Sequence, residues 1–341
     1  MSIELYETHE LIGVVDNTQP ISTYFLDLLF NRVHTSDSEY IDFDVLDKGK
    51  RLAPFVVPHV QGQPMLQRGY ETRKFKPAYS KQKDAIDPRR SIMRRPGEKL
   101  GGELSPGQRM DAVIVETQKD HYENLIRTWE WMAAQAVIFG QVTLEGENYP
   151  TTTVQFGRDA ANTVTPAALW SNAATARPLD DIKAAAQRIK KAGKQARRIT
   201  MSPDAAAAFF ATDQVKAEFE SRRGTSMGQA IEKNAGLNGD EAVYYGTLPG
   251  GIEVWELSAT YEDNLGDEQP YLPAGTAVLT GDIEGVRAFG AIMDDKAQWQ
   301  ALPVFPKMFT VPDPAGVFLL TQSAPLMVPL RPNASVLLNV L

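Results

Sequence analysis

Residues 105–139 carry the strongest structural signal in the chain, because both ends of a helix are marked and apolar positions recur between them. Ser105 followed by Pro106 is a typical helix start, and Gln108 completes a capping box. Gly140 is a natural stop. At about 1.5 Å per residue such a helix would span ~50 Å, and it far exceeds the mean helix length of about 11–12 residues. We therefore expect an elongated molecule with this helix as its backbone.

The flanking segments predict a mixture of helices and strands. Alternating apolar and acidic residues over 40–47 indicate a half-buried strand, and 141–157 is typical of a hairpin. Residues 51–60 are β-rich, but two prolines place them at a sheet edge or in a strand that leaves the body. The alternation over 160–282 indicates a second lobe of mixed helices and strands. Further elements are expected as helices over 21–30, 180–193 and 203–213, strands over 197–202 and 251–257, and an acidic loop over 261–270.

The stretch from Arg68 to Pro96 is strongly basic in an otherwise acidic protein. It holds ten Lys or Arg against three acids, a local charge of +7 in a chain whose formal charge is −8. It has few aliphatic residues and cannot build a core of its own, and connections of this length without a core are usually functional or disordered.

Composition leaves three interpretations of this basic stretch open. Its cations and interleaved aromatic residues could bind single-stranded nucleic acid. It could also be a solvated linker. The third interpretation is an arm that folds against another copy of this acidic chain, where opposite charges meet.

No residue pattern indicates catalysis or a bound cofactor. The chain has no Cys, which excludes disulfides, zinc–thiolate sites and thiol nucleophiles. Gly224-Thr225-Ser226-Met227-Gly228 fits the G-x-S-x-G pattern of hydrolases, but helical residues precede Ser226 and all four histidines come before it. His121 lacks a second ligand at helical spacing, so we interpret it as an interfacial or surface residue. We expect neither signal peptide nor membrane span, and a soluble protein that is not an enzyme and carries no metal.

Several sequence segments, which follow one another along nearly the whole chain, resemble the lambda-type major capsid protein (major head protein E) family of tailed bacteriophages. The first are STYFLDLLF near the start, FKPAYSKQKDAIDP with RRPGE in the basic stretch, and VKAEFESRRGTS in the second lobe. The later ones are YLPAGTAVLTG, GVRAFGAI, and FPKMFTVPDP with TQSAPLMVP. The last of these is the most specific.

The resemblance implies an α+β protein with the Hong Kong 97-type capsid fold. It implies an N-terminal arm over 1–48 and an extended loop (E-loop) over 49–98. A peripheral domain with the long spine helix would follow over 99–159, then an axial domain over 160–282. Residues 283–341 would return as peripheral strands and a last axial segment. In this layout the basic stretch is the E-loop, which lies over a neighbouring subunit.

The resemblance also implies a structural role without catalytic residues or cofactors. Copies of the chain would form pentamers and hexamers, assemble into a precursor shell with scaffold and portal proteins, and expand as double-stranded DNA is packaged. The protein would then belong to the virion and be assembled in the host bacterial cytoplasm. A decoration protein is a possible further partner, whereas a lysine–asparagine crosslink is not expected. No sequence-specific DNA contact and no membrane are expected.

We expect the cations of the E-loop to make the contacts between subunits. The residues are Lys74, Lys76, Lys81, Lys83, Arg89, Arg90, Arg94 and Arg95. The alternative function is a nucleic-acid-binding protein that uses the basic arm 68–96, and a steep salt dependence of DNA binding by the arm would distinguish it.

Overall fold

The computed structural model describes most of the 341 residues, in several stretches. These are 6–18, 21–38, 40–46, 61, 70–93, 104–146, 149–222, 234–236, 239–263, 266–312 and 315–341. The helices are α1 (Thr8–Asn17), α2 (Phe25–Leu29), α3 (Pro106–Phe139), α4 (Pro178–Lys191), α5 (Pro203–Ala211) and α6 (Asp213–Arg222). Short 3-10 turns include η1 (Pro88–Ser91), η2 (Ala160–Asn162), η4 (Asp295–Ala297) and η5 (Pro332–Ala334). Helices and sheets are mixed throughout, which confirms the α+β class.

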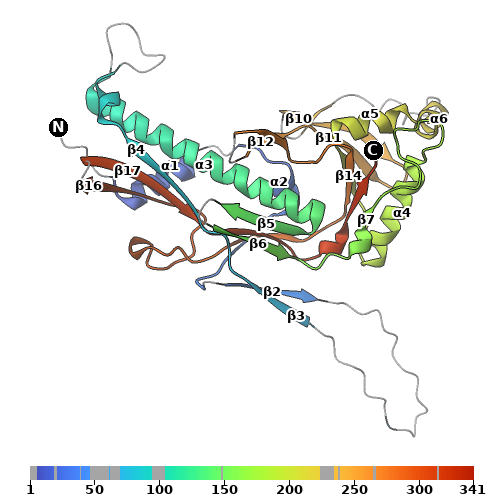
Figure 1. Ribbon diagram of the computed structural model, residues 1–341, viewed down its shortest axis with the longest axis horizontal. Coiled ribbons are helices and arrows are strands. Elements are labelled where there is room, and N and C mark those ends of the chain that lie inside the picture. Colours follow the sequence, from blue (N-terminus) through green and yellow to red (C-terminus); the bar gives the residue numbers. More distant parts are fainter. Residues whose placement is uncertain are drawn as a thin grey trace.

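The long helix α3 forms as its caps predict. The Ser105 side chain accepts a hydrogen bond from the backbone N–H of Gln108, and the Gln108 side chain accepts one from the Ser105 N–H. Gly140 ends the helix at φ 68°, in the left-handed region that glycine enters without a steric penalty. Figure 1 shows the helix running along one part of the body, with the large sheet and helices α4, α5 and α6 lying beyond its end.

A seven-stranded sheet occupies the end of the body opposite the start of α3 (Figure 1). Its order is β7-β19-β14-β8-β11-β10-β9. The bounds are β7 (Thr163–Val164), β8 (Arg198–Met201), β9 (Asn234–Gly236), β10 (Gly239–Leu248), β11 (Ile252–Leu257), β14 (Thr276–Thr280) and β19 (Ser335–Asn339). The final strand of the chain thus returns into this sheet. Side chains from α4, α5 and the sheet form one apolar core, which includes Ile182, Ile189, Phe209, Ile199 and Leu279.

Alternate residues of the same sheet join a second and larger core. Trp255, Leu257, Val278 and Leu337 pack there with α2 and with the second half of α3. A three-stranded sheet of order β1-β15-β18 completes this core. Its strands are β1 (Arg32–Thr35), β15 (Gly285–Phe289) and β18 (Pro325–Pro329). One sheet therefore contributes to both cores, because successive strand residues point to opposite faces.

The remaining strands lie beside or beyond α3. Strands β16 (Phe305–Pro312), β17 (Ala315–Ser323) and β4 (Ser80–Ile86) form an antiparallel sheet near the first half of the helix. Strand β2 (Ile41–Leu46) pairs with β3 (Tyr70–Phe75) in a ribbon that projects away from the body (Figure 1). Two hairpins, β5 (Gln141–Gly146) with β6 (Tyr149–Gln155) and β12 (Thr260–Glu262) with β13 (Glu268–Pro270), complete the fold.

The structure shortens one expected helix and replaces one expected loop by a hairpin. The helix expected over 21–30 is the short helix α2; its residues Phe25 and Leu26, and Phe30 directly after it, are fully buried in the larger core. The acidic segment 261–270, expected as a loop, carries the β12–β13 hairpin. The expected strand over 51–60 lies outside the described residues.

Candidate functional site

Two strands of the basic stretch pair within their own chain. At its start, β3 pairs with β2, and the Lys74 ammonium lies 3.6 Å from the Asp42 carboxylate across the ribbon. Later in the stretch, β4 adds to the sheet beside β17, from Ile86 opposite Val317 to Ser80 opposite Ser323. The stretch therefore pairs with its own chain at two places, whereas composition alone had indicated a segment without packing partners.

The strand β4 holds two of the four expected lysines against aromatic rings. The Lys83 ammonium lies 4.1 Å from the centre of the Phe318 ring, and Lys81 lies 5.1 Å from that of Tyr79. Such cation–π contacts at exposed sites are worth about 0.5–1 kcal/mol. Lys76, between the two strands, is exposed. These side chains thus have contacts in the single chain, and any contact with a neighbour would add to them.

Arg89 and Arg90 lie on the turn η1 at the base of the stretch, and both are exposed. The Asp87 side chain fixes this turn by accepting a hydrogen bond from the Arg89 N–H at 2.9 Å. Two apolar side chains follow, Ile92 and Met93, which are 79% and 63% exposed. Arg and Met are both enriched at protein–protein interfaces relative to the rest of the surface. Arg94 and Arg95 lie outside the described residues.

A buried polar seam joins the strand β4 and β17 to α3. His121 on the helix is 3% exposed; its Nδ1 lies 2.9 Å from the Thr321 hydroxyl and its Nε2 3.1 Å from the Asp84 carboxylate. His121 was expected as an interfacial or surface residue; it is instead buried within its own chain, between α3 and the strands β4 and β17. The strand that leads out of the basic stretch is therefore tied to the long helix by specific hydrogen bonds and not by apolar packing alone.

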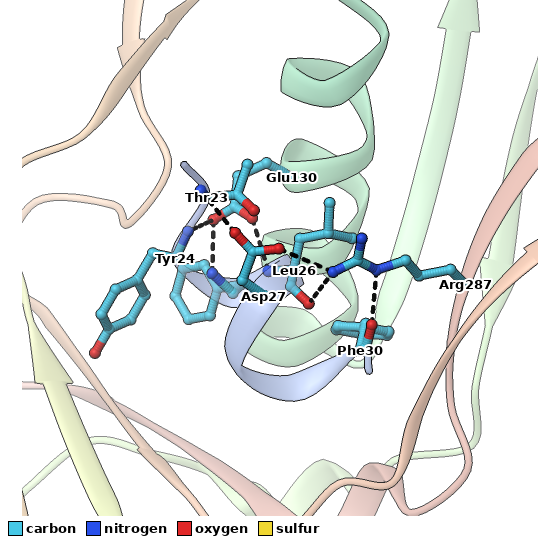
Figure 2. Close-up of polar contacts among 8 residues, drawn as sticks. Thr23, Tyr24, Leu26, Asp27, Phe30, Glu130 and Arg287 are labelled. Carbon is cyan, nitrogen blue, oxygen red and sulfur yellow. Dashed lines mark hydrogen bonds and ion pairs between the residues drawn. The ribbon is translucent and has the colours of Figure 1, made fainter. Parts of the chain in front are cut away.

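The junction around α2 is the most strongly built polar site in the core (Figure 2). Glu130 of α3 is 4% exposed, and its carboxylate accepts three backbone N–H groups at the start of α2. The distances are 3.2 Å from Tyr24, 2.7 Å from Phe25 and 2.7 Å from Leu26. These N–H groups have no partner inside α2, so Glu130 supplies the cap that this short helix lacks. Burial raises the pKa of Glu130 to about 7, although the three donors act in the opposite direction.

Arg287 of β15 binds the other end of α2 (Figure 2). Its Nε donates to the Phe30 carbonyl at 2.7 Å, and its Nη2 donates to the Leu26 carbonyl and the Asp27 carboxylate, each at 3.0 Å. A guanidinium cation at the carbonyl end and a carboxylate at the amide end both match the helix dipole. Two distant elements thus hold α2 at opposite ends.

Tyr24 extends the α2 junction to the seven-stranded sheet. Its hydroxyl lies 2.9 Å from that of Thr200 on β8, and its ring packs against Trp255 on β11. Burial raises the pKa of Tyr24 to about 12, so the hydroxyl stays protonated at neutral pH. The α2 junction therefore connects three parts of the fold mechanically: the long helix, the three-stranded sheet and the seven-stranded sheet.

Four charged groups bind together the two chain segments that cross between the sheets. Lys194, after α4, lies 2.9 Å from Asp282 and 2.6 Å from Glu284 on the segment between β14 and β15. Arg331, on the return from β18 to β19, lies 2.8 Å from the same Glu284. Lys194 holds the pKa of both carboxyls below their usual range, so the network is fully charged at neutral pH.

Within the described stretches, no three His, Asp or Glu side chains gather closely enough to hold a metal ion. None of the described helices is both long and apolar enough to span a bilayer. The G-x-S-x-G segment 224–228 lies outside the described residues.

Sequence reasoning missed Glu130 and Arg287. A signal for Glu130 was present, because this acid follows Trp129 and lies one helical turn from Ile126 and Ala134, on the apolar side of α3. An acid on a buried helix face requires a partner. Nothing in the neighbourhood of Arg287 in the sequence distinguishes it from a surface cation on a strand.

Comparisons with known proteins agree in covering almost the whole chain. The profile of the family described as Phage major capsid protein E matches residues 7–340. The P21 prophage-derived major head protein of Escherichia coli O6:H1 is 30% identical over 98% of this chain and 99% of its own length. The major capsid protein of Escherichia phage lambda is 28% identical over 97% of this chain and 98% of its own length.

A solved structure shows the fold. The crystal structure of a protein assigned as a capsid protein of an E. coli CFT073 prophage superimposes with a TM-score of 0.75. The superposition covers 99% of this chain and 100% of that one, at 23% identity. The expected Hong Kong 97-type fold is thereby confirmed.

Proposed function

This chain belongs to the phage major capsid protein E family, and from that premise we propose that it is the subunit of an icosahedral phage head. The observation that carries the proposal is the family match over residues 7–340, which covers nearly the whole chain. Many copies would form a closed shell around double-stranded DNA, first as a precursor and then in an expanded form. The mature location is the virion.

The basic stretch supplies the contact between subunits in this proposal. Two of its strands are fixed by pairing, β3 with β2 and β4 with β17, and the turn η1 follows directly after β4. Arg89 and Arg90 are exposed beside Ile92 and Met93, in a chain whose formal charge is −8. Opposite charges steer the stretch of one copy toward the acidic surface of the next. We propose this role for all eight cations named from the sequence.

The same proposal includes the oligomeric units of the shell and the other proteins that take part in assembly. Pentamers and hexamers would be the building units, with scaffold and portal proteins guiding assembly in the host cytoplasm and a decoration protein as a further partner. The subunit would perform no catalysis and bind DNA without sequence specificity. The domain division made from the sequence is part of this proposal. The nucleic-acid-binding alternative is not favoured, because the relatives that match along the whole chain are named as head or capsid proteins.

Sedimentation of the purified full-length chain tests this function. A shell subunit should change from small species to one large, homogeneous species above a threshold concentration, because closed symmetric assembly is cooperative. A chain that remains a monomer at all salt and protein concentrations, with and without co-expressed scaffold, would contradict the proposal.

A further inference from the structure

The loop between β15 and β16 displays a tryptophan in a strained backbone conformation. Gln298 and Trp299 have φ angles of 51° and 59°, in the left-handed region that side-chain-bearing residues rarely adopt. Two such residues in succession are less common still, and neither is a glycine. Trp299 is 55% exposed. The strain therefore does not serve to bury this ring in the core of its own chain.

The rest of the loop is held firmly enough to maintain that strain. The Asp294 side chain, 9% exposed, pairs with Lys307 and accepts hydrogen bonds from the Gln322 side chain and the Lys296 N–H. The Ala301 N–H donates to Asp37 at 3.0 Å, and the Ile292 N–H donates to the Gln300 carbonyl at 3.0 Å. A small apolar cluster supports the loop from beneath, formed by Ile292, Ala297, Phe305 and Ala324.

Rigid, strained segments that expose a large side chain indicate a binding role. Strain of this kind costs of order 1–3 kcal/mol per residue and persists only where the surroundings enforce it. Preorganisation lowers the entropy lost when a loop binds a partner. Tryptophan is also among the residues most enriched at the energetic centres of protein interfaces. Met293, at the start of the loop, is 42% exposed and extends the apolar surface.

The charges of the loop indicate which partner fits. Between Met293 and Gln300 the charged residues are Asp294, which is paired internally, and the exposed neighbours Asp295 and Lys296. Nucleic acid requires a row of cations, which this surface lacks. Copies of an acidic chain repel one another over most of their surface, but here the exposed charges are of opposite sign and adjacent. Across a two-fold axis the same patch meets itself, so Asp295 of one copy can face Lys296 of the other.

We propose that the loop 293–300 is a preformed self-association contact, with Trp299 as its anchor against a second copy of this chain. The proposal rests on the shell function proposed above and adds a contact independent of the basic stretch. Its partner is another subunit, not DNA and not an accessory protein.

Acrylamide quenching of tryptophan fluorescence tests the contact on the full-length chain. The chain has five tryptophans; Trp129, Trp170 and Trp255 are buried, Trp131 is half-buried and Trp299 is exposed. The difference between wild type and W299F therefore isolates the signal of Trp299. We expect that signal to be strongly quenched in the dissociated subunit and protected in the assembled shell. Equal quenching in subunit and shell would overturn the proposal.

Two variants give the energetic test. W299A should keep the circular dichroism and melting temperature of the subunit but raise the concentration for half-assembly by about tenfold or more, as expected for loss of an interface anchor. Q298G is the matched control: it keeps the indole but loosens the preformed backbone, so assembly should weaken less than in W299A. If W299A formed shells as well as wild type, the Trp299 contact would be overturned, whereas the shell function would stand.

The remaining outcomes are distinguishable. Wild-type chain that never assembles would contradict the shell function, and the contact with it. Trp299 that gains protection only when an accessory viral protein binds finished shells would overturn the self-contact. Were W299A to misfold, the quenching comparison on wild type and W299F would still decide the question.

Discussion

The Glu130 carboxylate on the long helix accepts the backbone N–H of Phe25 at 2.7 Å, although the two residues are 105 positions apart. This hydrogen bond and its two neighbours cap α2 with a side chain from another element (Figure 2). Because Tyr24 then contacts β8 and β11, the bond couples the long helix to the seven-stranded sheet. A subunit that must keep its shape within a shell needs such a connection between its parts.

Replacing Glu130 by Ala should lower the free energy of unfolding by about 2–4 kcal/mol, because buried N–H groups left without partners are costly. Chemical denaturation of the dissociated subunit measures this effect. Glu123→Ala is the matched control on the same helix, because it removes only a partly exposed ion pair with Arg127. Such a pair is typically worth about 0–1 kcal/mol. Equal losses from the two variants would show that Glu130 is not a structural cap.

The pH dependence of stability should carry a component from Glu130. Burial raises its pKa from the ordinary 4.5 to about 7, so between these values the folded chain binds a proton that the unfolded chain does not. Stability should therefore fall as pH rises through this window, by about 3 kcal/mol in all. Unfolding curves of wild type and Glu130→Gln at several pH values isolate the component. A wild-type slope no steeper than that of the variant would contradict the assignment.

Trp129 and Trp131 should respond differently to truncation. Trp129 is 6% exposed and packs edge-on against Phe289, with ring centres 5.1 Å apart, whereas Trp131 is only half-buried at the margin of the same core. Trp129→Ala should cost about 3–5 kcal/mol and Trp131→Ala clearly less. The melting temperature of the subunit reports both. The reverse order would place the wrong face of α3 against the core.

The ends of the long helix could be predicted from sequence because caps are local. Ser105, Gln108 and Gly140 lie within a few residues of the backbone groups that they satisfy. The same holds for the Ser202 cap of α5. The positive charge of the basic stretch could also be recognised from the sequence, because counting charged residues requires no knowledge of the fold.

The junction around α2 could not be predicted in the same way. The partners of Glu130 and Arg287 lie more than 100 residues away along the chain, and their pairing depends on how the sheets stack. The position of Lys83 is similar: its contact with Phe318 requires that β4 pair with β17. Local pattern predicts elements, whereas these sites arise only when distant elements meet.

Changing Arg89, Arg90, Arg94 and Arg95 together to Ala should weaken assembly and leave the subunit folded. Arg89 and Arg90 are exposed in the single chain, so their removal should cost little in a monomer. Moderate salt should mimic the defect in wild type, because screening acts over about 8–10 Å. Circular dichroism and sedimentation measure the two effects. Normal shells, or an unfolded subunit, would each contradict the interface role of these arginines.

Cryo-electron microscopy of particles assembled from the purified chain tests the central claim most directly. The account predicts closed shells with five-fold vertices, in which the basic stretch of one subunit lies over its neighbour. It also predicts that the α2 junction is intact within every subunit. Open aggregates, a uniform population of monomers, or shells in which the basic stretch contacts only its own subunit would contradict it.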